Sequence, residues 1–186
     1  SQEALASRVG ADILEAGGNA IDAAVATGFA LAVTLPRAGN LGGGGFLVFW
    51  NQPERRGYAL NFREMAPRRA HKDLFLGADG RVDRQLATRS LLSTGVPGTV
   101  AGLLKAQERF GSLSRAEVMA PAIRLAEQGF AVYPVLADSL KRAAPLLQAD
   151  PSAKAIYYKS GGEPYRAGEI LRQPLLAATL RGIAEQ

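Results

Sequence analysis

The sequence contains no cysteine and a single histidine among its 186 residues. Without cysteine, the chain can form neither a disulfide nor a thiolate nucleophile. A serine or cysteine triad also needs a histidine or an equivalent base. The one histidine, His71, lies in the polar segment RRAHKD at residues 68–73, where a solvated surface side chain is expected. The composition therefore argues against a histidine-dependent triad within this chain.

Patterns for metal and nucleotide binding are missing as well. A lone histidine with scattered carboxylates lacks the clustered ligand spacing of zinc sites, and no calcium loop of alternating acids with a central glycine occurs. The glycine run at residues 42–45 lacks the Gly-Lys-Ser/Thr ending of a phosphate-binding loop, and it precedes a strand-like run instead of a helix. We therefore expect no metal site, no nucleotide and no other cofactor.

Long hydrophobic runs are also absent. The longest apolar run, Ala23–Leu35, has 13 residues, whereas about 20 are needed to cross a bilayer. Residues 1–16 mix acidic and basic residues in an amphipathic pattern, without the apolar region of a signal peptide. We expect a soluble chain with no membrane span and no signal peptide, whose abrupt start indicates that an upstream leader was removed or left out.

The positive charge of the chain is dispersed. The net charge is +5 and the sequence pI is about 9.8, with the densest basic cluster at residues 68–72. Nucleic-acid binding needs basic residues on one face with interleaved aromatics, or a known module, and neither occurs, so no nucleic-acid partner is expected. An apolar content of 47% in 186 residues allows one core, and therefore one domain or slightly more.

The most informative stretch of the sequence covers residues 39–67. Four consecutive glycines at 42–45 lead directly into Phe46–Trp50, an apolar, aromatic-rich run of strand length. Without Cβ atoms, the glycine backbone can adopt positive φ or let another chain segment or a ligand approach closely. Residues 52–57 are polar and turn-rich, and Tyr58–Phe62 alternates as a second strand, so an antiparallel hairpin is predicted.

Arg63 ends this hairpin and is the candidate substrate-binding residue. At the end of a strand and beside a glycine-rich backbone, its guanidinium can hold a carboxylate through two parallel hydrogen bonds, a geometry that lysine cannot match. A buried ion pair with Glu64 or another acid would use the same geometry. The pattern alone therefore leaves both roles of Arg63 open.

Helical periodicity dominates the rest of the chain. Helices are predicted over residues 2–16, 23–35, 100–110, 114–128, 134–147 and 175–184, and irregular excursions over 67–89 and 155–172. The glycine-rich start of the helix at 100–110 can bind an anion on free N–H groups, although an ordinary cap is the commoner arrangement. Mixed helices and strands place the chain in the α/β class.

Four segments carry a resemblance to a known family: NAIDAAVATGFALAV at 19–33, GNLGGGGF at 39–46, NFREMAP at 61–67 and TGVPGTVAGL at 94–103. Their order and spacing resemble the γ-glutamyltranspeptidase family, including its acylase relatives. Weaker similarity at 119–132 extends the match over most of the chain.

The resemblance implies an α/β fold that forms part of the αββα four-layer sandwich of N-terminal-nucleophile hydrolases. Residues 1–186 then correspond to the N-terminal portion of the large subunit. In such proteins a precursor cuts itself, and a threonine at the start of the small subunit attacks the substrate amide. That subunit lies outside this chain and is the expected heterodimer partner. The chain is thus expected to hold no catalytic residue, Ser1 included, and to be inactive alone.

For function, the resemblance implies γ-glutamyl transfer from, or hydrolysis of, glutathione and related γ-glutamyl amides, and a periplasmic or secreted location in a bacterium. It assigns the α-carboxylate of this small-molecule substrate to Arg63. Asn61 departs from the aspartate of many relatives, which leaves the partner of the arginine turn open. The alternatives are a cephalosporin (glutaryl) acylase of the same family and a non-catalytic carboxylate-binding domain.

Overall fold

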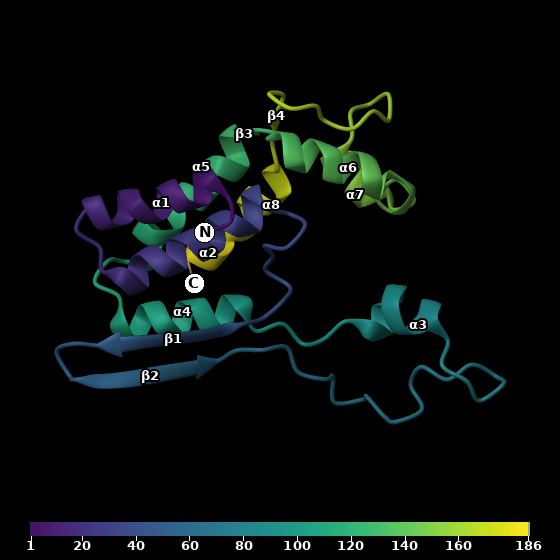
Figure 1. Cartoon of the computed structure of the whole chain (residues 1–186), viewed down its shortest axis with the longest axis horizontal. Helices are drawn as coiled ribbons and strands as arrows, with labels where there is room; N and C mark the ends of the chain where they lie inside the picture. The colour runs from purple at the N-terminus through teal and green to yellow at the C-terminus, as the bar shows by residue number, and fades with distance from the viewer. Residues whose placement is uncertain (186) are drawn as a thin grey trace. The chain divides into compact units, whose positions relative to one another are not determined.

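The computed structural model describes residues 1–185, and the chain divides into two compact units (Figure 1). The helical unit comprises residues 1–40 together with the segment from Leu104 onward, and the hairpin unit comprises residues 41–103. The boundary between the two units falls inside helix α4 (Thr99–Phe110).

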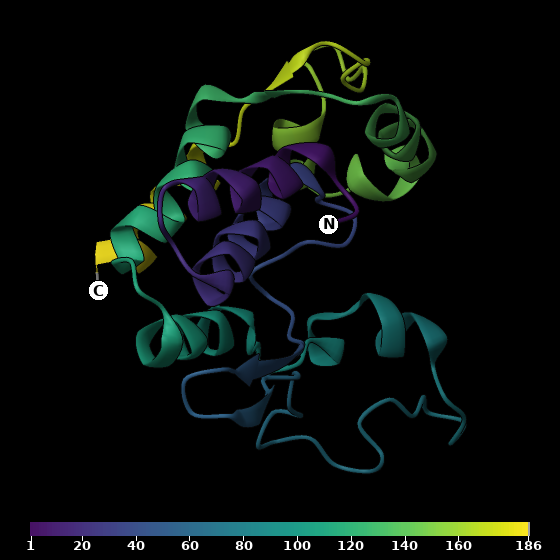
Figure 2. The ribbon, with the colours of Figure 1, turned by 60° about the vertical axis from the view of Figure 1, so that its left-hand side comes forward.

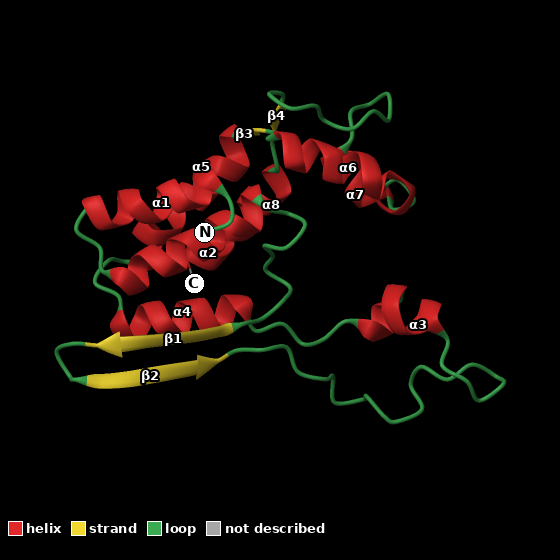
Figure 3. Ribbon diagram, viewed as in Figure 1, coloured by secondary structure: helices red, strands yellow, loops and turns green. Residues whose placement is uncertain are grey.

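Helices make up most of the helical unit: α1 (Ala4–Glu15), α2 (Ala20–Thr34), the end of α4, α5 (Arg115–Gln128), β3 (Phe130–Ala131), α6 (Pro134–Leu147), α7 (Pro151–Tyr157), β4 (Ile170–Leu171) and α8 (Pro174–Glu185). The hairpin unit contains β1 (Phe46–Asn51), β2 (Arg56–Asn61), α3 (Arg84–Arg89), the 3₁₀ helix η1 (Leu91–Ser93) and the start of α4. Figure 3 shows the strands confined to two short antiparallel pairs. Within residues 1–185, none of the helices combines the length and the apolar character needed to cross a bilayer.

Local capping explains where the first two helices begin and end. The side chain of Glu3 accepts hydrogen bonds from two N–H groups of the first turn of α1. This helix ends just before Gly17, as predicted, where φ is +92°. The side chains of Asn19 and Asp22 each bond to the other's backbone N–H in a capping box. Helix α2 consequently begins at Ala20, three residues before the predicted apolar body.

Helix α2 is central to the core of the helical unit. Val25, Phe29 and Val33 have no exposed surface, and full burial of such a side chain stabilises the fold by roughly 1.5–3 kcal/mol. The helix packs against α1 and α5, and Figure 1 and Figure 2 both show α1 alongside it. Because α2 is apolar all round, it needs cover on more than one side.

The later helices also follow the predicted boundaries. Helix α5 begins with the predicted capping box at residues 114–117 and ends at Gly129, where φ is +87°. The short strands β3 and β4 then pair antiparallel, with Phe130 opposite Leu171. Helix α8 follows and packs against α5, with Leu180 fully buried.

Two predicted excursions contain helices that the sequence pattern did not reveal. The loop or hairpin expected over residues 155–172 is wrong at its start, because α7 extends to Tyr157. The side chain of Asp150 caps α7 by accepting a hydrogen bond from the backbone N–H of Ala153 at 2.7 Å, and Pro151 occupies the first position of the helix. Within the excursion at 67–89, α3 also follows a capping aspartate, Asp83. Both helices are only six or seven residues long, too short for apolar periodicity to appear.

In the hairpin unit, β1 and β2 form the predicted antiparallel hairpin, with Phe46 paired to Asn61. One face of β1 carries Phe46, Val48 and Trp50, each at least 59% exposed. Within residues 1–185, each of these strands pairs only with the other. The assignment of residues 1–186 to the N-terminal portion of a large subunit stays a prediction.

Candidate functional site

Arg63 lies two residues beyond the end of β2, within the hairpin unit. The side-chain Oδ1 of Asn61 accepts a hydrogen bond from the backbone N–H of Arg63 at 3.0 Å. In such an Asx turn, a side-chain oxygen takes the place of a backbone acceptor and bends the chain. The strand therefore ends in a turn that leaves Arg63 exposed.

Glycines pack against the backbone of this turn. A Cβ atom on Gly44 would lie 2.8 Å from the Cα atom of Arg63 and 2.5 Å from the carbonyl oxygen of Phe62. A Cβ atom on Gly98 would collide with the same carbonyl oxygen, and one on Gly102 would collide with the Phe62 ring. Only residues without a Cβ fit at these contacts. The close approach predicted for the glycine run is therefore confirmed.

Backbone hydrogen bonds join the glycine run to the turn and to the start of α4. Phe62 and Gly45 exchange two bonds, at 3.0 and 3.4 Å, which extends the hairpin ladder by one pair. The carbonyl oxygen of Gly43 accepts bonds from the N–H groups of Gly98 and Thr99 at 2.7 and 3.0 Å. Because these two N–H groups are engaged, the start of α4 is an ordinary structural turn and does not present them to an anion.

The chain is anchored again just after Arg63. Met65 and Val96 form an isolated antiparallel bridge with bonds of 3.2 and 2.8 Å. A Cβ atom on Gly95, the residue before Val96, would lie 3.0 Å from the Cβ of Glu64. Three of the four segments that carry the family resemblance, separate in the sequence, thus meet at the arginine turn.

Arg63 lines a cavity of about 490 Å³ in the hairpin unit. The cavity is lined by Arg63, Glu64, Met65, Ala66, Pro67, Ala70, Leu74, Phe75, Leu92, Ser93, Thr94 and Gly95. None of the ion pairs within residues 1–185 includes Arg63. Of the two roles that the sequence left open, the structure therefore does not show the ion pair with Glu64 or another acid, and the guanidinium can receive an anionic ligand.

Two parts of this candidate site have little or no signal in the sequence pattern. Ala70, Leu74 and Phe75 come from a segment without periodicity, so no sequence pattern indicates that they reach the cavity. The other part is Asn61, which differs from the aspartate of many similar proteins. An asparagine two residues before an arginine at a strand end is a signal for an Asx turn, and that signal could have identified it.

Other residues considered from the sequence lie elsewhere. His71 is exposed and is not among the residues that line the Arg63 cavity. Ser1 precedes α1, and its ammonium group donates to the hydroxyl of Ser7 at 2.7 Å. In the part of the chain that the structure describes, no group of three or more histidine, aspartate or glutamate side chains is placed to hold a metal ion.

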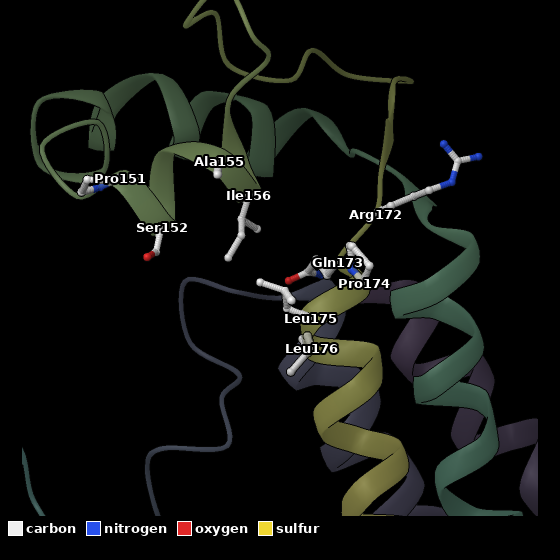
Figure 4. Close-up of a pocket in the computed structure, with 9 residues that line it drawn as sticks. All are labelled: Pro151, Ser152, Ala155, Ile156, Arg172, Gln173, Pro174, Leu175 and Leu176. Atoms are coloured by element: carbon white, nitrogen blue, oxygen red, sulfur yellow. The ribbon is translucent and has the colours of Figure 1, made fainter.

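A second cavity, of about 410 Å³, lies in the helical unit beside α7 and the start of α8 (Figure 4). It is lined by Pro151, Ser152, Ala155, Ile156, Arg172, Gln173, Pro174, Leu175 and Leu176. Figure 4 shows the guanidinium of Arg172 pointing away from the other lining side chains. The Gln173 Nε2 group donates to the carbonyl oxygen of Val33 at 2.9 Å. This cavity is mainly apolar and does not offer the arrangement that a carboxylate substrate needs.

The helical unit also holds a buried carboxylate with a structural role. Asp22 has no exposed surface and accepts bonds from the N–H and hydroxyl of Ser112, at 2.9 and 2.7 Å, and from the N–H of Asn19, at 2.9 Å. Burial raises the pKa of Asp22, but these bonds and one from Leu113 outweigh it and hold the pKa below its ordinary value of 3.8. The charged carboxylate thereby ties the start of α2 to the loop between α4 and α5.

Comparisons with known proteins agree in sequence and in structure. Residues 6–186 match the family model described as Gamma-glutamyltranspeptidase. The chain is 47% identical over 186 residues to the glutathione hydrolase proenzyme of Escherichia coli strain K12. This match covers 100% of this chain and 32% of that protein. It is 40% identical over 189 residues to the Acylase ACY 1 proenzyme of Pseudomonas sp. strain V22, covering 98% of this chain and 33% of that one.

The structure superimposes on the crystal structure of Helicobacter pylori γ-glutamyltranspeptidase with a TM-score of 0.96 and 44% sequence identity, over 100% of this chain and 53% of that chain. The predicted fold class, a mixed helix and strand part of the N-terminal-nucleophile hydrolase sandwich, is therefore confirmed. The chain spans about a third of the length of the curated relatives it matches. Both relatives are named as proenzymes, that is, as precursors that are processed.

Proposed function

Because the chain belongs to the γ-glutamyltranspeptidase family, we propose that it is part of an enzyme that transfers or hydrolyses the γ-glutamyl group of glutathione and related amides. The observation that carries this proposal is the placement of Arg63 at the cavity of the hairpin unit, with no ion pair to a described residue. The resemblance between the E. coli glutathione hydrolase proenzyme and this chain supports glutathione as the substrate class.

In this proposal Arg63 binds the α-carboxylate of the γ-glutamyl group. The guanidinium presents two parallel N–H donors in one plane, which match the two oxygens of a carboxylate. A carboxylate held in this way fixes one end of the substrate, and the γ-amide, three carbon atoms away, is then directed to one place. Positioning of this kind converts binding energy into orientation at the reacting bond.

The nucleophile of the proposed reaction lies outside this chain, on a small subunit cut from the same precursor. Its threonine hydroxyl adds to the γ-amide carbonyl, its α-amine accepts the hydroxyl proton, and the amine of the substrate leaves with a proton. Water or a second amine then takes the acyl group, which gives hydrolysis or transfer. The proenzyme names of the relatives and the third of their length that this chain spans support the two-subunit arrangement. Residues 1–186 alone are then inactive.

A second candidate is a glutaryl acylase of the same family. The observation that favours it is the 40% identity to the Acylase ACY 1 proenzyme of Pseudomonas sp.. In that reaction Arg63 would hold the terminal carboxylate of a glutaryl group, which has no α-amine beside it. The two substrates therefore share the carboxylate and differ in one ammonium group.

The test uses the full-length protein with two substrates, γ-glutamyl-p-nitroanilide and a glutaryl amide. Turnover of the first supports γ-glutamyl transfer or hydrolysis, and preferential turnover of the second supports the acylase. No turnover of either substrate by a self-cleaved protein would favour the non-catalytic carboxylate-binding domain. Residues 1–186 serve as the matched control, and measurable turnover by them would contradict the placement of the nucleophile outside this chain.

A further inference from the structure

We propose that Asn61 is a positioning residue for Arg63 and thereby sets the affinity of the site for a carboxylate. The inference rests on the proposed carboxylate-binding role of Arg63. Its starting observation is the 3.0 Å hydrogen bond from the backbone N–H of Arg63 to Oδ1 of Asn61. The Asn61 side chain contacts the backbone of Arg63 and not its guanidinium group, so the effect of Asn61 on substrate binding is indirect.

The chain is held firmly on either side of Arg63. Before it, Phe62 exchanges two backbone bonds with Gly45. After it, Met65 exchanges two with Val96. Arg63 and Glu64 lie between these anchors. The bond to Asn61 fixes the N–H of Arg63, and the contact with Gly44 leaves no free space behind its Cα atom.

The direction of the backbone matters because the guanidinium lies at the end of a long, flexible side chain. A small rotation at the Cα atom moves that group by a large distance, and bidentate binding of a carboxylate tolerates little misplacement. Loss of the bond to Asn61 would free the N–H of Arg63 to bond with water in several conformations. Substrate binding would then have to restore the turn, at a cost in affinity.

The neutral amide of Asn61 also suits the charge of the site. An aspartate at this position would accept the same backbone bond. It would add a negative charge on the side chain that bonds to the backbone N–H of Arg63, and this charge would attract the guanidinium in competition with the carboxylate of the substrate. Asparagine therefore provides the acceptor without the competing charge. Affinity for the carboxylate should therefore be highest with asparagine at position 61, lower with aspartate and lowest with alanine.

The experiment compares variants of the full-length protein with γ-glutamyl-p-nitroanilide. Asn61→Ala is expected to raise KM about three- to tenfold, the size of one lost hydrogen bond, while kcat, self-cleavage and the thermal midpoint stay close to those of the unmodified protein. The KM of Asn61→Asp is expected to lie between those of the unmodified protein and Asn61→Ala. The matched control is Asn51→Ala at the other end of the hairpin. Oδ1 of Asn51 also accepts a local backbone bond, from Glu54 at 3.4 Å, and KM is expected to stay unchanged.

A double-mutant cycle separates this proposal from the proposed function. In an Arg63→Ala background, removal of the Asn61 side chain should add no further increase in KM, because its effect passes through Arg63. If Arg63→Ala itself leaves KM unchanged, the proposed function of the arginine fails. If Arg63→Ala raises KM and Asn61→Ala does not, only the role of Asn61 fails.

Two further outcomes would overturn the role of Asn61. One is an equal increase in KM with and without Arg63. The other is loss of self-cleavage or thermal stability in proportion to the rise in KM, which would make Asn61 a structural residue. Should Asn61→Ala fail to fold, Asn61→Ser keeps a weaker acceptor. KM must then rise from asparagine through aspartate to serine, and any other order contradicts the proposal.

Discussion

The two units of the chain are stabilised in opposite ways. Almost all the buried apolar side chains within residues 1–185 belong to the helical unit, and Leu103 is the only one in the hairpin unit. The hairpin unit is held by backbone bonds between the glycine run, the arginine turn and the start of α4, at distances that only glycine permits. The candidate site thus lies in the unit without a core of large side chains.

This difference predicts which kinds of substitution each unit resists. In the helical unit, removing side-chain volume leaves a cavity and is costly. In the hairpin unit, adding volume forces backbone segments apart, and this changes the position of Arg63. The first kind of change should alter stability, and the second should alter substrate binding.

The largest expected effect is that of Phe29→Ala in α2. Phe29 has no exposed surface, so its truncation should lower the free energy of unfolding by about 3–5 kcal/mol. The matched control is Phe46→Ala in β1, where the side chain is 64% exposed and the expected change is within about 0.5 kcal/mol. Urea unfolding of residues 1–186 measures both, because the exposed fractions are those of this chain alone. A comparable loss for Phe46→Ala would contradict the comparison.

Arg63→Lys tests the chemistry of the hairpin unit without a change of charge. Lysine cannot make two parallel N–H···O bonds, so substrate binding should weaken by roughly 1.5–3 kcal/mol. In the proposed function, self-cleavage would act on the precursor's own backbone and use no free carboxylate, so it should survive. KM and kcat with a γ-glutamyl anilide and a gel of the processed subunits provide the measurement.

The control for this change is Arg68→Lys, an exposed arginine of the same unit that does not line the cavity. Its kinetics should not change. An unprocessed or unfolded Arg63→Lys protein would show that the arginine is structural, and unchanged kinetics would remove it from the site.

Gly98→Ala adds one methyl group where the backbone of Phe62 leaves no room. Overpacking of this kind costs about 1–3 kcal/mol, and here it should displace the arginine turn, raise KM and speed hydrogen exchange in β1 and β2. Gly42→Ala is the matched control, because a Cβ atom there meets nothing within 4 Å. Equal kinetics for the two variants would show that close glycine contacts do not position the site.

The smallest effect concerns pH and the helical unit. The pKa of Asp22 lies below 3.8 in the folded protein, so the folded state releases this proton more readily than the unfolded state does. The stability contributed by the carboxylate is therefore fully present above pH 3.8, and it is lost as pH falls through the lower pKa of the folded protein.

Asp22→Asn should cost about 0.5–2 kcal/mol at neutral pH, as for other helix caps, and the difference should shrink below pH 3.8. Asp12→Asn is the control, since Asp12 is exposed in a surface pair with Arg8. Hydrogen exchange at the start of α2, measured between pH 3 and pH 7, reports the effect. A difference that is constant over this range would contradict the linkage to the charge of Asp22.

Features that depend on neighbours in the sequence were predictable. The hairpin follows from alternation in two short runs around a polar turn, and the ends of α1 and α5 follow from Gly17 and Gly129, which adopt positive φ. The close approach at Gly44 and Gly45, within the predicted glycine run, follows from the absence of Cβ atoms. The place of Arg63 just beyond a strand end was also predictable, because it depends only on the strand before it. Its substrate-binding role stays a prediction.

The surroundings of Arg63 were beyond the reach of local patterns. Its cavity combines Phe75 and Leu92 with the arginine turn, and the bridge from Met65 to Val96 joins residues 31 positions apart. Such contacts arise from the folded chain as a whole, and no periodicity encodes them. The same pattern in Arg63 and Glu64 permitted either an ion pair or a ligand site. An ion pair depends on which groups the fold places around the guanidinium, and within residues 1–185 Arg63 has no ion-pair partner. Its role as a ligand site stays a prediction.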